Sequence, residues 1–204
     1  MSVRMMGITV AVGLAAVAVG ITARGEEDDA AREADGRVLF DFEADDAAEQ
    51  WVTVNDGVMG GVSQGRFRVT DEATLEFFGK LSLKNNGGFA SVRSRPAELK
   101  LKDGDALSVR VRGDGRTYYI NVHVPTLRMA FSYRKPVETV EGEWREVRVP
   151  LSELVPTSFG RPVERLGPVD PERINAVGFL LADKRAGPFK LDIDWIKAVR
   201  AEAK

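Results

Sequence analysis

Apolar and polar side chains alternate along most of the chain from residue 37 onward. In the run Thr117–Val124, for example, Tyr118 and Ile120 alternate with Asn121 and His123 on the opposite side. A period of two places successive side chains on opposite faces of a strand, so each such run predicts a strand with one buried face. The predicted strands are Val38–Phe42, Phe67–Thr70, Thr74–Leu83, Phe89–Arg95, Ala106–Arg112, Thr117–Val124, Arg128–Arg134, Trp144–Leu151, Ala176–Ala182 and Phe189–Val199.

Helical periodicity is scarce in the same region. Only two short turns are predicted, at Ala44–Gln50 and at Asp170–Arg173, where Asp170 precedes a proline in the first helical position. Residues 156–170 are rich in proline and glycine and predict the longest irregular segment. About ten antiparallel strands separated by turn residues are typical of an all-β sandwich or jelly roll, here a single domain over residues 37–200.

The N-terminal segment has a different composition from the predicted domain. Arg4 is followed by an uncharged apolar run and then by small residues, so residues 1–25 predict a cleaved export signal or, since the run is nearly long enough to span a membrane, an uncleaved anchor. Residues 26–36 predict an acidic linker. We therefore expect an exported protein that is periplasmic, secreted or anchored outside the cytoplasmic membrane, with membrane contact only through this segment.

Composition excludes several classes of function. A formal net charge of -2 argues against a nucleic-acid binder, and the absence of cysteine excludes thiolate metal sites and cysteine nucleophiles. His123 is the one histidine in the sequence, and no Gly-x-Ser-x-Gly or phosphate-loop motif occurs. We expect no catalytic residues and no cofactor. A calcium ion held by acids such as Asp41, Glu43 and Asp194 stays open from the sequence.

A glycine-rich loop is the most distinctive feature, running from Trp51 to Gly65. Its candidate binding residues are Asn55, Asp56, Met59 and Ser63. The loop can bind a ligand through backbone N–H groups and the Asp56 carboxylate, or it can be a turn whose polar side chains bond their own backbone. The second interpretation is favoured, with a docking edge as a further alternative.

A second candidate is a polar face opposite the apolar sides of several strands. If these strands adjoin, they form one arginine-rich patch suited to carboxylates, phosphates or sugar hydroxyls. The alternative is a solvated face neutralised by Glu146, Asp192 and Asp194. The candidate residues are Arg93, Arg110, Arg112, Tyr119, Asn121 and His123, with Arg95, Arg134 and Arg148 on the same sides of their strands.

Six short motifs, in order along the chain, resemble the complex I intermediate-associated protein 30 family. They are Trp51-x3-Asn55-Asp-Gly-Val-Met-Gly-Gly-Val-Ser63, Phe78-Gly-Lys-Leu-Ser-Leu83, Asn85-Asn-Gly-Gly-Phe-Ala-Ser-Val-Arg93, Arg112-Gly-Asp-Gly-Arg116 with Tyr119, Trp144-x5-Pro150, and Gly178-Phe with Asp183-Lys and Gly187-Pro-Phe. The resemblance covers about residues 38–199. It implies a galactose-binding-like β-sandwich and a non-catalytic, chaperone-like assembly role, with a protein partner such as respiratory complex subunits.

The export prediction places that role in the cell envelope. The alternative function is a carbohydrate-binding module that recognises an extracytoplasmic glycan, because such modules share this fold. A glycan binder should expose two or three aromatic side chains on one face. Most aromatic residues of this chain fall on the apolar sides of the predicted strands, which counts against the alternative.

Overall fold

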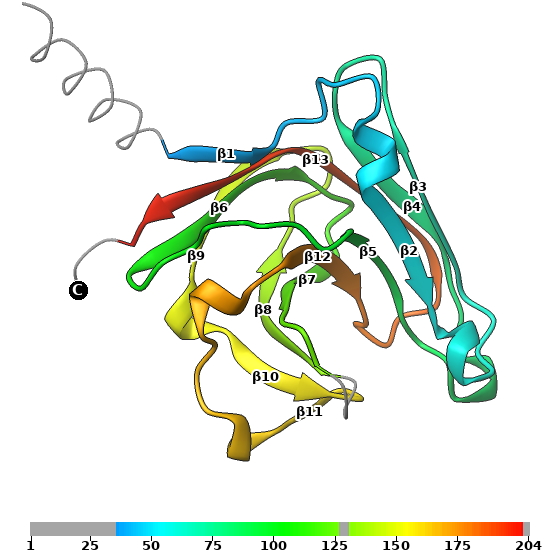
Figure 1. Ribbon diagram of the computed structural model, residues 1–204. Coiled ribbons are helices and arrows are strands. Elements are labelled where there is room, and N and C mark those ends of the chain that lie inside the picture. Colours follow the sequence, from blue (N-terminus) through cyan, green and yellow to red (C-terminus); the bar gives the residue numbers. More distant parts are fainter. Residues whose placement is uncertain (1–35, 127–130, 202–204) are drawn as a thin grey trace, which may run out of the picture.

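The computed structural model describes residues 36–126 and 131–201. Within these residues the chain forms thirteen strands in two antiparallel sheets that pack face to face around one apolar core (Figure 1). The predicted galactose-binding-like all-β sandwich is therefore confirmed, with a few more strands than expected. Residues 1–35 lie outside the described part, so the predicted signal and nearly all of the predicted linker stay predictions.

Sheet A contains the longest strand, β13 (Gly187–Arg200), which is hydrogen-bonded to β4 on one side and β6 on the other. The register shifts between Ile193 and Trp195, which marks a bulge. The other strands of this sheet are β1 (Arg37–Phe40), β3 (Gln64–Val69), β4 (Leu75–Leu81), β6 (Asp105–Arg112) and β9 (Trp144–Pro150). Their order is β3-β4-β13-β6-β9, and β1 also pairs with β13.

Sheet B curves from β2, at the right of Figure 1, to β10 at the bottom. Its order is β11-β10-β8-β7-β12-β5-β2. The strands are β2 (Trp51–Asn55), β5 (Ala90–Ser94), β7 (Thr117–His123), β8 (Ser132–Glu138), β10 (Val155–Ser158), β11 (Arg161–Pro162) and β12 (Ala176–Leu181). Each sheet thus has one face toward the other sheet and one outer face.

The core lies between the sheets and is built from the apolar side of each alternating strand. Phe77 of β4 packs against Phe189 of β13 with ring centroids 4.9 Å apart, and both are buried. Phe40 and Phe42 pack against Trp51, which joins the two sheets at one edge. Burying a large apolar side chain stabilises a fold by about 1.5–3 kcal/mol, so this core is sufficient without metals or disulfides.

The helical elements of the described residues are all short 3₁₀ turns. The two predicted turns are found as η1 (Ala47–Gln50) and η6 (Pro171–Arg173), and Asp170 caps the second by accepting a hydrogen bond from the Glu172 N–H. The others are η2 (Asp56–Met59), η3 (Lys84–Asn86), η4 (Leu151–Glu153) and η5 (Glu164–Leu166). None of the helices in the described residues is long and apolar enough to cross a membrane.

One boundary prediction was wrong and another lies partly outside the described residues. The segment 156–170, predicted to be irregular, contains most of β10 and all of β11, because Thr157 and Ser158 pair across a tight turn despite the surrounding prolines. The strand predicted to begin at Arg128 is described only from Ser132, since residues 127–130 lie outside the described part.

Candidate functional site

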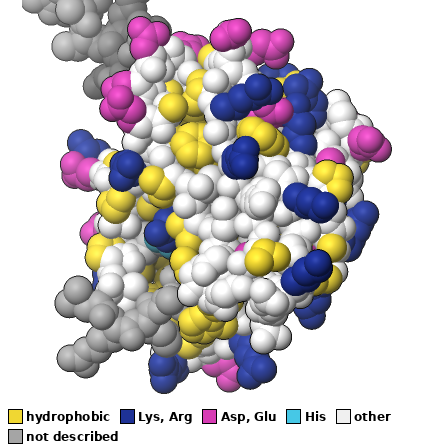
Figure 2. All heavy atoms as spheres, turned by 90° about the vertical axis from the view of Figure 1, so that its right-hand side faces the viewer, with side chains coloured by type: hydrophobic (Ala, Val, Ile, Leu, Met, Phe, Trp, Pro, Cys, Tyr) yellow, Lys and Arg dark blue, Asp and Glu magenta, His cyan; other side chains and the backbone are white. Residues whose placement is uncertain are grey.

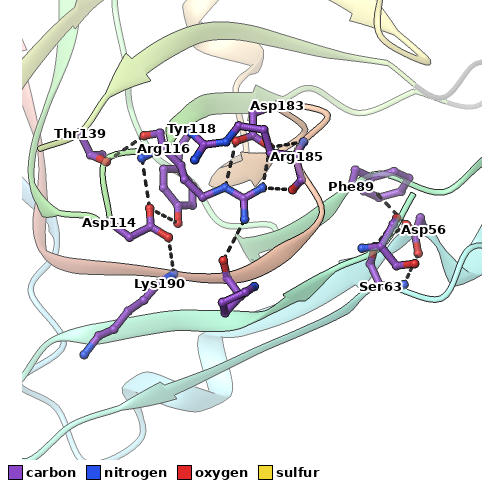
Figure 3. Close-up of polar contacts among 12 residues, drawn as sticks. Asp56, Ser63, Phe89, Asp114, Arg116, Tyr118, Thr139, Asp183, Arg185 and Lys190 are labelled. Atoms are coloured by element: carbon purple, nitrogen blue, oxygen red, sulfur yellow. Dashed lines mark hydrogen bonds and ion pairs between the residues drawn. The ribbon is translucent and has the colours of Figure 1, made fainter. Parts of the chain in front are cut away.

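The glycine-rich loop is organised around the carboxylate of Asp56, which is fully buried. The carboxylate accepts hydrogen bonds from the Ser63 hydroxyl at 2.6 Å, the Ser63 N–H at 2.9 Å and the Gly88 N–H at 2.7 Å, and a longer one from the Phe89 N–H (Figure 3). Burial alone would raise the pKa of Asp56, but the bonds from Ser63, Gly88 and Phe89 together hold that pKa below its usual value. The carboxylate therefore closes the loop and also ties it to the segment that leads into β5, which carries Gly88 and Phe89.

The neighbouring residues of the loop follow the same pattern. The Asn55 side chain accepts from the Gly65 N–H at 3.2 Å and donates to the Gly65 carbonyl at 3.0 Å, so its amide is also engaged within the loop. A Cβ on Gly61 would collide with the Asp56 carboxylate, which explains why this position needs glycine. Asn55, Asp56 and Ser63 thus serve the backbone of the loop. Met59 differs, because it is exposed.

The loop presents apolar side chains outward. Val58 is 74% exposed, Met59 45% and Val62 48%. The buried Asp56 holds the turn that carries them. The docking-edge alternative from the sequence therefore has a defined surface, which we call the loop rim: Val58, Met59 and Val62.

A second closed site, missed by sequence reasoning, surrounds the buried side chain of Arg116 (Figure 3). Its guanidinium donates to both oxygens of Asp183, at 2.9 and 2.6 Å, and to the carbonyls of Pro188 and Arg185. Burial alone would raise the pKa of Asp183. The hydrogen bonds from Arg116 and Arg185 outweigh this effect, so the pKa of Asp183 lies below its usual value. This Arg116 cluster fastens the loop before β13 to the start of β7.

Asp114 extends the cluster. It accepts from the Tyr118 hydroxyl at 3.1 Å and from the Lys190 N–H at 2.9 Å. The signal in the sequence was the motif Arg112-Gly-Asp-Gly-Arg116 together with Asp183. Arg116 and Asp183 are 67 positions apart, however, and no periodicity links them. Two of the six motifs quoted above thus form internal fastenings of the fold.

The predicted single arginine-rich patch was wrong, because the structure divides its residues between two outer faces. Arg110 and Arg112 lie on β6, on the outer face of sheet A, where they pair with Asp194 and Asp192. Both guanidinium groups also lie over the Trp144 ring, at 4.9 and 4.7 Å from its centroid. Alternation specifies the side of a strand on which a residue lies, but it does not specify the sheet.

Other charges on the outer face of sheet A are neutralised in the same way. Glu76 pairs with Arg68 and with Lys190, and Lys190 also lies 3.5 Å from Asp192. Arg148 lies 3.6 Å from Glu146. Figure 2 shows the side of the molecule formed by β2, β3 and β4, with basic side chains spread across it and small, separate groups of apolar ones. For this sheet, the alternative of a solvated, neutralised face is confirmed.

Arg93, Tyr119, Asn121 and His123 lie together on the outer face of sheet B. The register aligns them with Arg134, and one line of residues crosses the sheet from β2 to β10. This line, the arginine row, consists of Val52, Arg93, Gly178, Asn121, Arg134 and Val155.

Electrostatically, the arginine row is the opposite of the face of sheet A. Arg93 and Arg134 are half-buried, and in the described part of the chain neither forms an ion pair with a carboxylate. Arg134 lies over the Tyr119 ring, 4.5 Å from its centroid. Burial lowers the pKa of Arg134, only partly opposed by Tyr119. Two positive charges therefore stand on one sheet face without compensation from the described residues.

The centre of the row contains an unsatisfied polar group. Asn121 is 5% exposed. Its amide nitrogen, Nδ2, lies 3.1 Å from His123 Nε2, and its amide oxygen, Oδ1, has no hydrogen-bond partner among the described residues. Burial and then the charge of Arg93 lower the pKa of His123 to about 4, so its imidazole is neutral at pH 7. Because His123 is neutral, the positive charge of the arginine row is carried by Arg93 and Arg134.

The structure gives no support to a metal site in the described residues. Asp194 is engaged by Arg110, and no group of three His, Asp or Glu side chains in the described ranges is arranged to hold a metal ion. The calcium alternative raised by Asp41, Glu43 and Asp194 therefore has no geometric basis there.

Comparison with known proteins identifies one family model, described as Complex I intermediate-associated protein 30, which matches residues 40–193. Similar proteins of that name come from Mus musculus, 29% identical with 78% of this chain and 55% of the relative covered, and from Drosophila melanogaster, 28% identical with 78% and 61% covered. A relative from Caenorhabditis elegans, described as probable, is 30% identical with 81% and 54% covered. The chain thus spans little more than half the length of these curated relatives.

Solved structures with the same fold include the family 11 carbohydrate-binding module of a Clostridium thermocellum cellulase. It has a TM-score of 0.60 and 15% sequence identity, with 83% of this chain and 96% of the module covered. The same type of module in complex with a mixed-linked tetrasaccharide has a TM-score of 0.59 and 15% identity, with coverage of 82% and 97%. At this identity the likeness shows the fold alone.

The comparisons also correct the expected localisation. The relatives from mouse, fruit fly and nematode are named as mitochondrial proteins, so the prediction of an exported periplasmic, secreted or envelope-anchored protein was wrong. The physical reason is that an apolar N-terminal run reports hydrophobicity alone. That property does not identify the membrane system that receives the segment.

Proposed function

The chain belongs to the complex I intermediate-associated protein 30 family, and from this premise we propose that it is a non-catalytic, chaperone-like protein that binds subunits of respiratory complex I during assembly. The observation that carries the proposal is the use made of the residues that mark the family. Their polar groups form hydrogen bonds within the chain, between Asp56 and Ser63 and between Arg116 and Asp183. They fix loops and are not free to act on a substrate.

Two surfaces offer what a protein partner requires. The loop rim is apolar and exposed, and it is held by a buried carboxylate, so the backbone that carries its side chains has little entropy left to lose on binding. The outer face of sheet B combines arginines and a tyrosine with the apolar side chains Val52 and Leu180. Arginine and tyrosine are enriched at the centres of protein interfaces.

The glycan-binding alternative has the fold in its favour, but the side chains of sheet B speak against it. Among the described strands of this sheet, Tyr119 is the aromatic residue that alternation places on the outer face, and its ring is covered by Arg134. A flat sugar ring is usually held by exposed aromatic faces. Phe159 is 76% exposed, but it lies at the turn between β10 and β11.

The test is affinity purification of the tagged, full-length chain from the membranes of the cells that produce it, followed by mass spectrometry. We expect enrichment of complex I subunits over an untagged control. The double variant Val58→Ser and Met59→Ser should reduce that recovery by about fivefold or more, since two apolar contacts of roughly 0.5–1 kcal/mol each are lost. Thermal stability should be unchanged.

The matched control is Val38→Ser, which removes an equally exposed apolar side chain on β1, away from the loop rim. It should retain recovery. Purification that yields no complex I subunit, together with retention of the chain on immobilised polysaccharide, would replace the assembly role by glycan binding. Equal loss in the rim variant and in the control would remove the loop rim from the interface.

A further inference from the structure

The arginine row combines two half-buried arginines that lack a carboxylate partner with a buried amide oxygen that lacks a hydrogen-bond donor among the described residues. A half-buried arginine is stabilised by a carboxylate partner, and its desolvation is uncompensated when none is present. The outer face of sheet A shows that this chain readily supplies such partners, since Asp192 and Asp194 serve Arg112 and Arg110. Their absence beside Arg93 and Arg134 in the described residues is therefore a specific property of the row.

We propose that the arginine row binds an acidic, extended segment of a partner protein, whose aspartate or glutamate carboxylates are held by Arg93 and Arg134. This inference rests on the proposed protein-binding function and deepens it by naming the chemistry of the partner. Carboxylates match the planar guanidinium geometry, in which two parallel N–H groups face two oxygens.

The dimensions of the row suit a peptide. Arg93 lies on β5 and Arg134 on β8, three strand spacings apart, so their Cα atoms are separated by roughly 14 Å. That distance corresponds to about four residues of extended chain. Two glutamates on one side of an extended peptide, two residues apart, are separated by only about 7 Å at their Cα atoms. The long side chains of Arg93 and Arg134 must therefore each lean inward by about 3–4 Å to meet them.

Gly178 provides the space between the two arginines. It lies in the row directly between Arg93 and Asn121, and a Cβ at this position would be 2.7 Å from the Arg93 Cβ. The same Cβ would lie 2.4 Å from the Val92 carbonyl oxygen, so any larger residue would push β12 and β5 apart as well as displace Arg93. The absence of a side chain leaves the sheet surface low where a ligand backbone would pass.

Asn121 marks the polar centre of the row. Its oxygen is a buried acceptor without a donor among the described residues, and because it is shielded from solvent a ligand N–H would reach it only after the side chain turned outward. An extended peptide carries the carboxylates that the arginines lack, and backbone N–H groups for that acceptor. Val52 and Val155 lie at the two ends of the row and Leu180 beside it, so apolar side chains of the peptide also find contacts.

Charge favours the acidic peptide over a glycan. An acidic sugar also supplies carboxylates, but its ring lacks an uncovered aromatic face among the described strands of sheet B. The neutral state of His123 keeps the positive charge of the face on the two arginines, where a carboxylate would form charge-assisted hydrogen bonds.

The experiment titrates the full chain with the peptide acetyl-Gly-Glu-Val-Glu-Gly-amide, and with the same peptide carrying Gln in place of Glu. Binding is followed through the ¹H–¹³C signal of the His123 ring, which is unambiguous because the sequence contains one histidine. We expect the Glu peptide to bind about tenfold more tightly than the Gln peptide, and to lose affinity with added salt. A carboxylate beside Arg93 should also raise the pKa of His123.

Variants locate the binding site. Arg93→Gln and Arg134→Gln should each weaken binding about fivefold, which corresponds to one partly exposed charge pair. The matched control Arg110→Gln, on the outer face of sheet A, should change affinity by less than about twofold. Thermal melting of each variant verifies that it is folded, and Arg93→Lys, which keeps the charge but loses the forked geometry, should fall between wild type and Arg93→Gln.

Several results would overturn the inference. These are equal binding of the Glu and Gln peptides, equal effects of the row variants and of Arg110→Gln, or tighter binding of tri-galacturonate or inorganic phosphate than of the Glu peptide. The outcome is separable from the proposed function. If complex I subunits co-purify with the double variant Arg93→Gln and Arg134→Gln as well as with wild type, the row is excluded while the assembly role stands.

Discussion

The Arg116 cluster, at the turn before β7, and the arginine row, on the outer face of sheet B, place arginines in opposite circumstances. Arg116 is buried, and its donors reach two carboxylate oxygens and two carbonyls. Arg93 and Arg134 are half-buried and lack a carboxylate partner in the described residues. Both arrangements remove arginine side chains at least partly from water. The difference is that the donors of Arg116 are hydrogen-bonded within the chain, whereas Arg93 and Arg134 remain available to a carboxylate from outside it.

This difference separates residues that build the fold from residues available to a partner. Unsatisfied buried groups cost stability, so they persist where something else completes them. The Asp56 loop belongs with the Arg116 cluster, because its carboxylate has hydrogen bonds from three neighbouring residues. The family motifs supply residues to both kinds of site: Asp56, Arg116 and Asp183 build the closed ones, whereas Arg93 and Gly178 lie in the open one. The open site was found only after folding brought its strands together.

Breaking the Arg116 cluster should give the largest effect on stability. Asp183→Ala leaves a buried guanidinium without its counter-charge and should lower the free energy of unfolding by about 3–5 kcal/mol. Urea denaturation measures the change. The control Asp194→Ala removes the partner of the more exposed Arg110 and should cost less than about 1 kcal/mol. Equal losses would contradict the distinction between buried and exposed pairs.

The Asp56 loop should respond somewhat less. Asp56→Asn keeps the shape but places an NH₂ group against N–H donors, so we expect a loss of about 2–3 kcal/mol. Proteolysis within residues 57–62 should accelerate in parallel. Asp45→Asn, at an exposed position, serves as the control and should leave the unfolding midpoint unchanged. A stable Asp56→Asn variant would mean that the charge is unnecessary to the loop.

Acid should weaken the fold in two separate windows. The pKa of His123 is lowered from 6.5 to about 4, so between these values the unfolded chain binds a proton that the folded chain does not, and stability falls as pH decreases. Asp56 and Asp183 also have lowered pKa values; their contribution is complete above about pH 4 and is lost below it. In the wild type, the upper window should lower the free energy of unfolding by about 1–2 kcal/mol after allowance for partial exposure, and His123→Gln should abolish this window alone. Urea midpoints from pH 7 to 3 measure both windows, and an unchanged upper window in the variant would contradict the assignment.

The arginine row should give the smallest effect on stability. Arg93→Gln or Arg134→Gln should change the free energy of unfolding by less than about 0.5 kcal/mol, in either direction, because no ion pair with a described residue is broken. The same melting experiments as above provide the measurement. A loss above about 2 kcal/mol would place these residues with Arg116, among those that hold the fold.

Much of the fold was readable from the sequence because alternation is local. β6, β7 and β12 begin and end close to the predicted positions, and the Asp170 cap was also predicted. β2, β10 and β11 were missed. The residues of β2 were assigned to the glycine-rich loop that begins at Trp51, and proline and glycine in residues 156–162 hide the pairing of β10 and β11. Periodicity describes one strand at a time, and it carries no information on which strands become neighbours.

The candidate site was predictable only in part for the same reason. Arg93, Tyr119, Asn121 and His123 were correctly expected on polar sides of their strands, but Arg110 and Arg112 were grouped with them although they lie on the other sheet. Arg134, which completes the row, was noted without its position. Strand order, which depends on packing of the whole core, determined the outcome.

β13 has a kinetic consequence for a newly made chain. It is the last strand of the described fold, yet it hydrogen-bonds to β4, β6 and β1, which lie far earlier in the sequence. Before residue 187 has been synthesised, β3 and β4 can form only a hairpin that is separate from β6 and β9, with their apolar sides uncovered. Completion of the sandwich must wait for the C-terminal strand, so this protein should itself fold slowly and late, dependent during that interval on protection from aggregation.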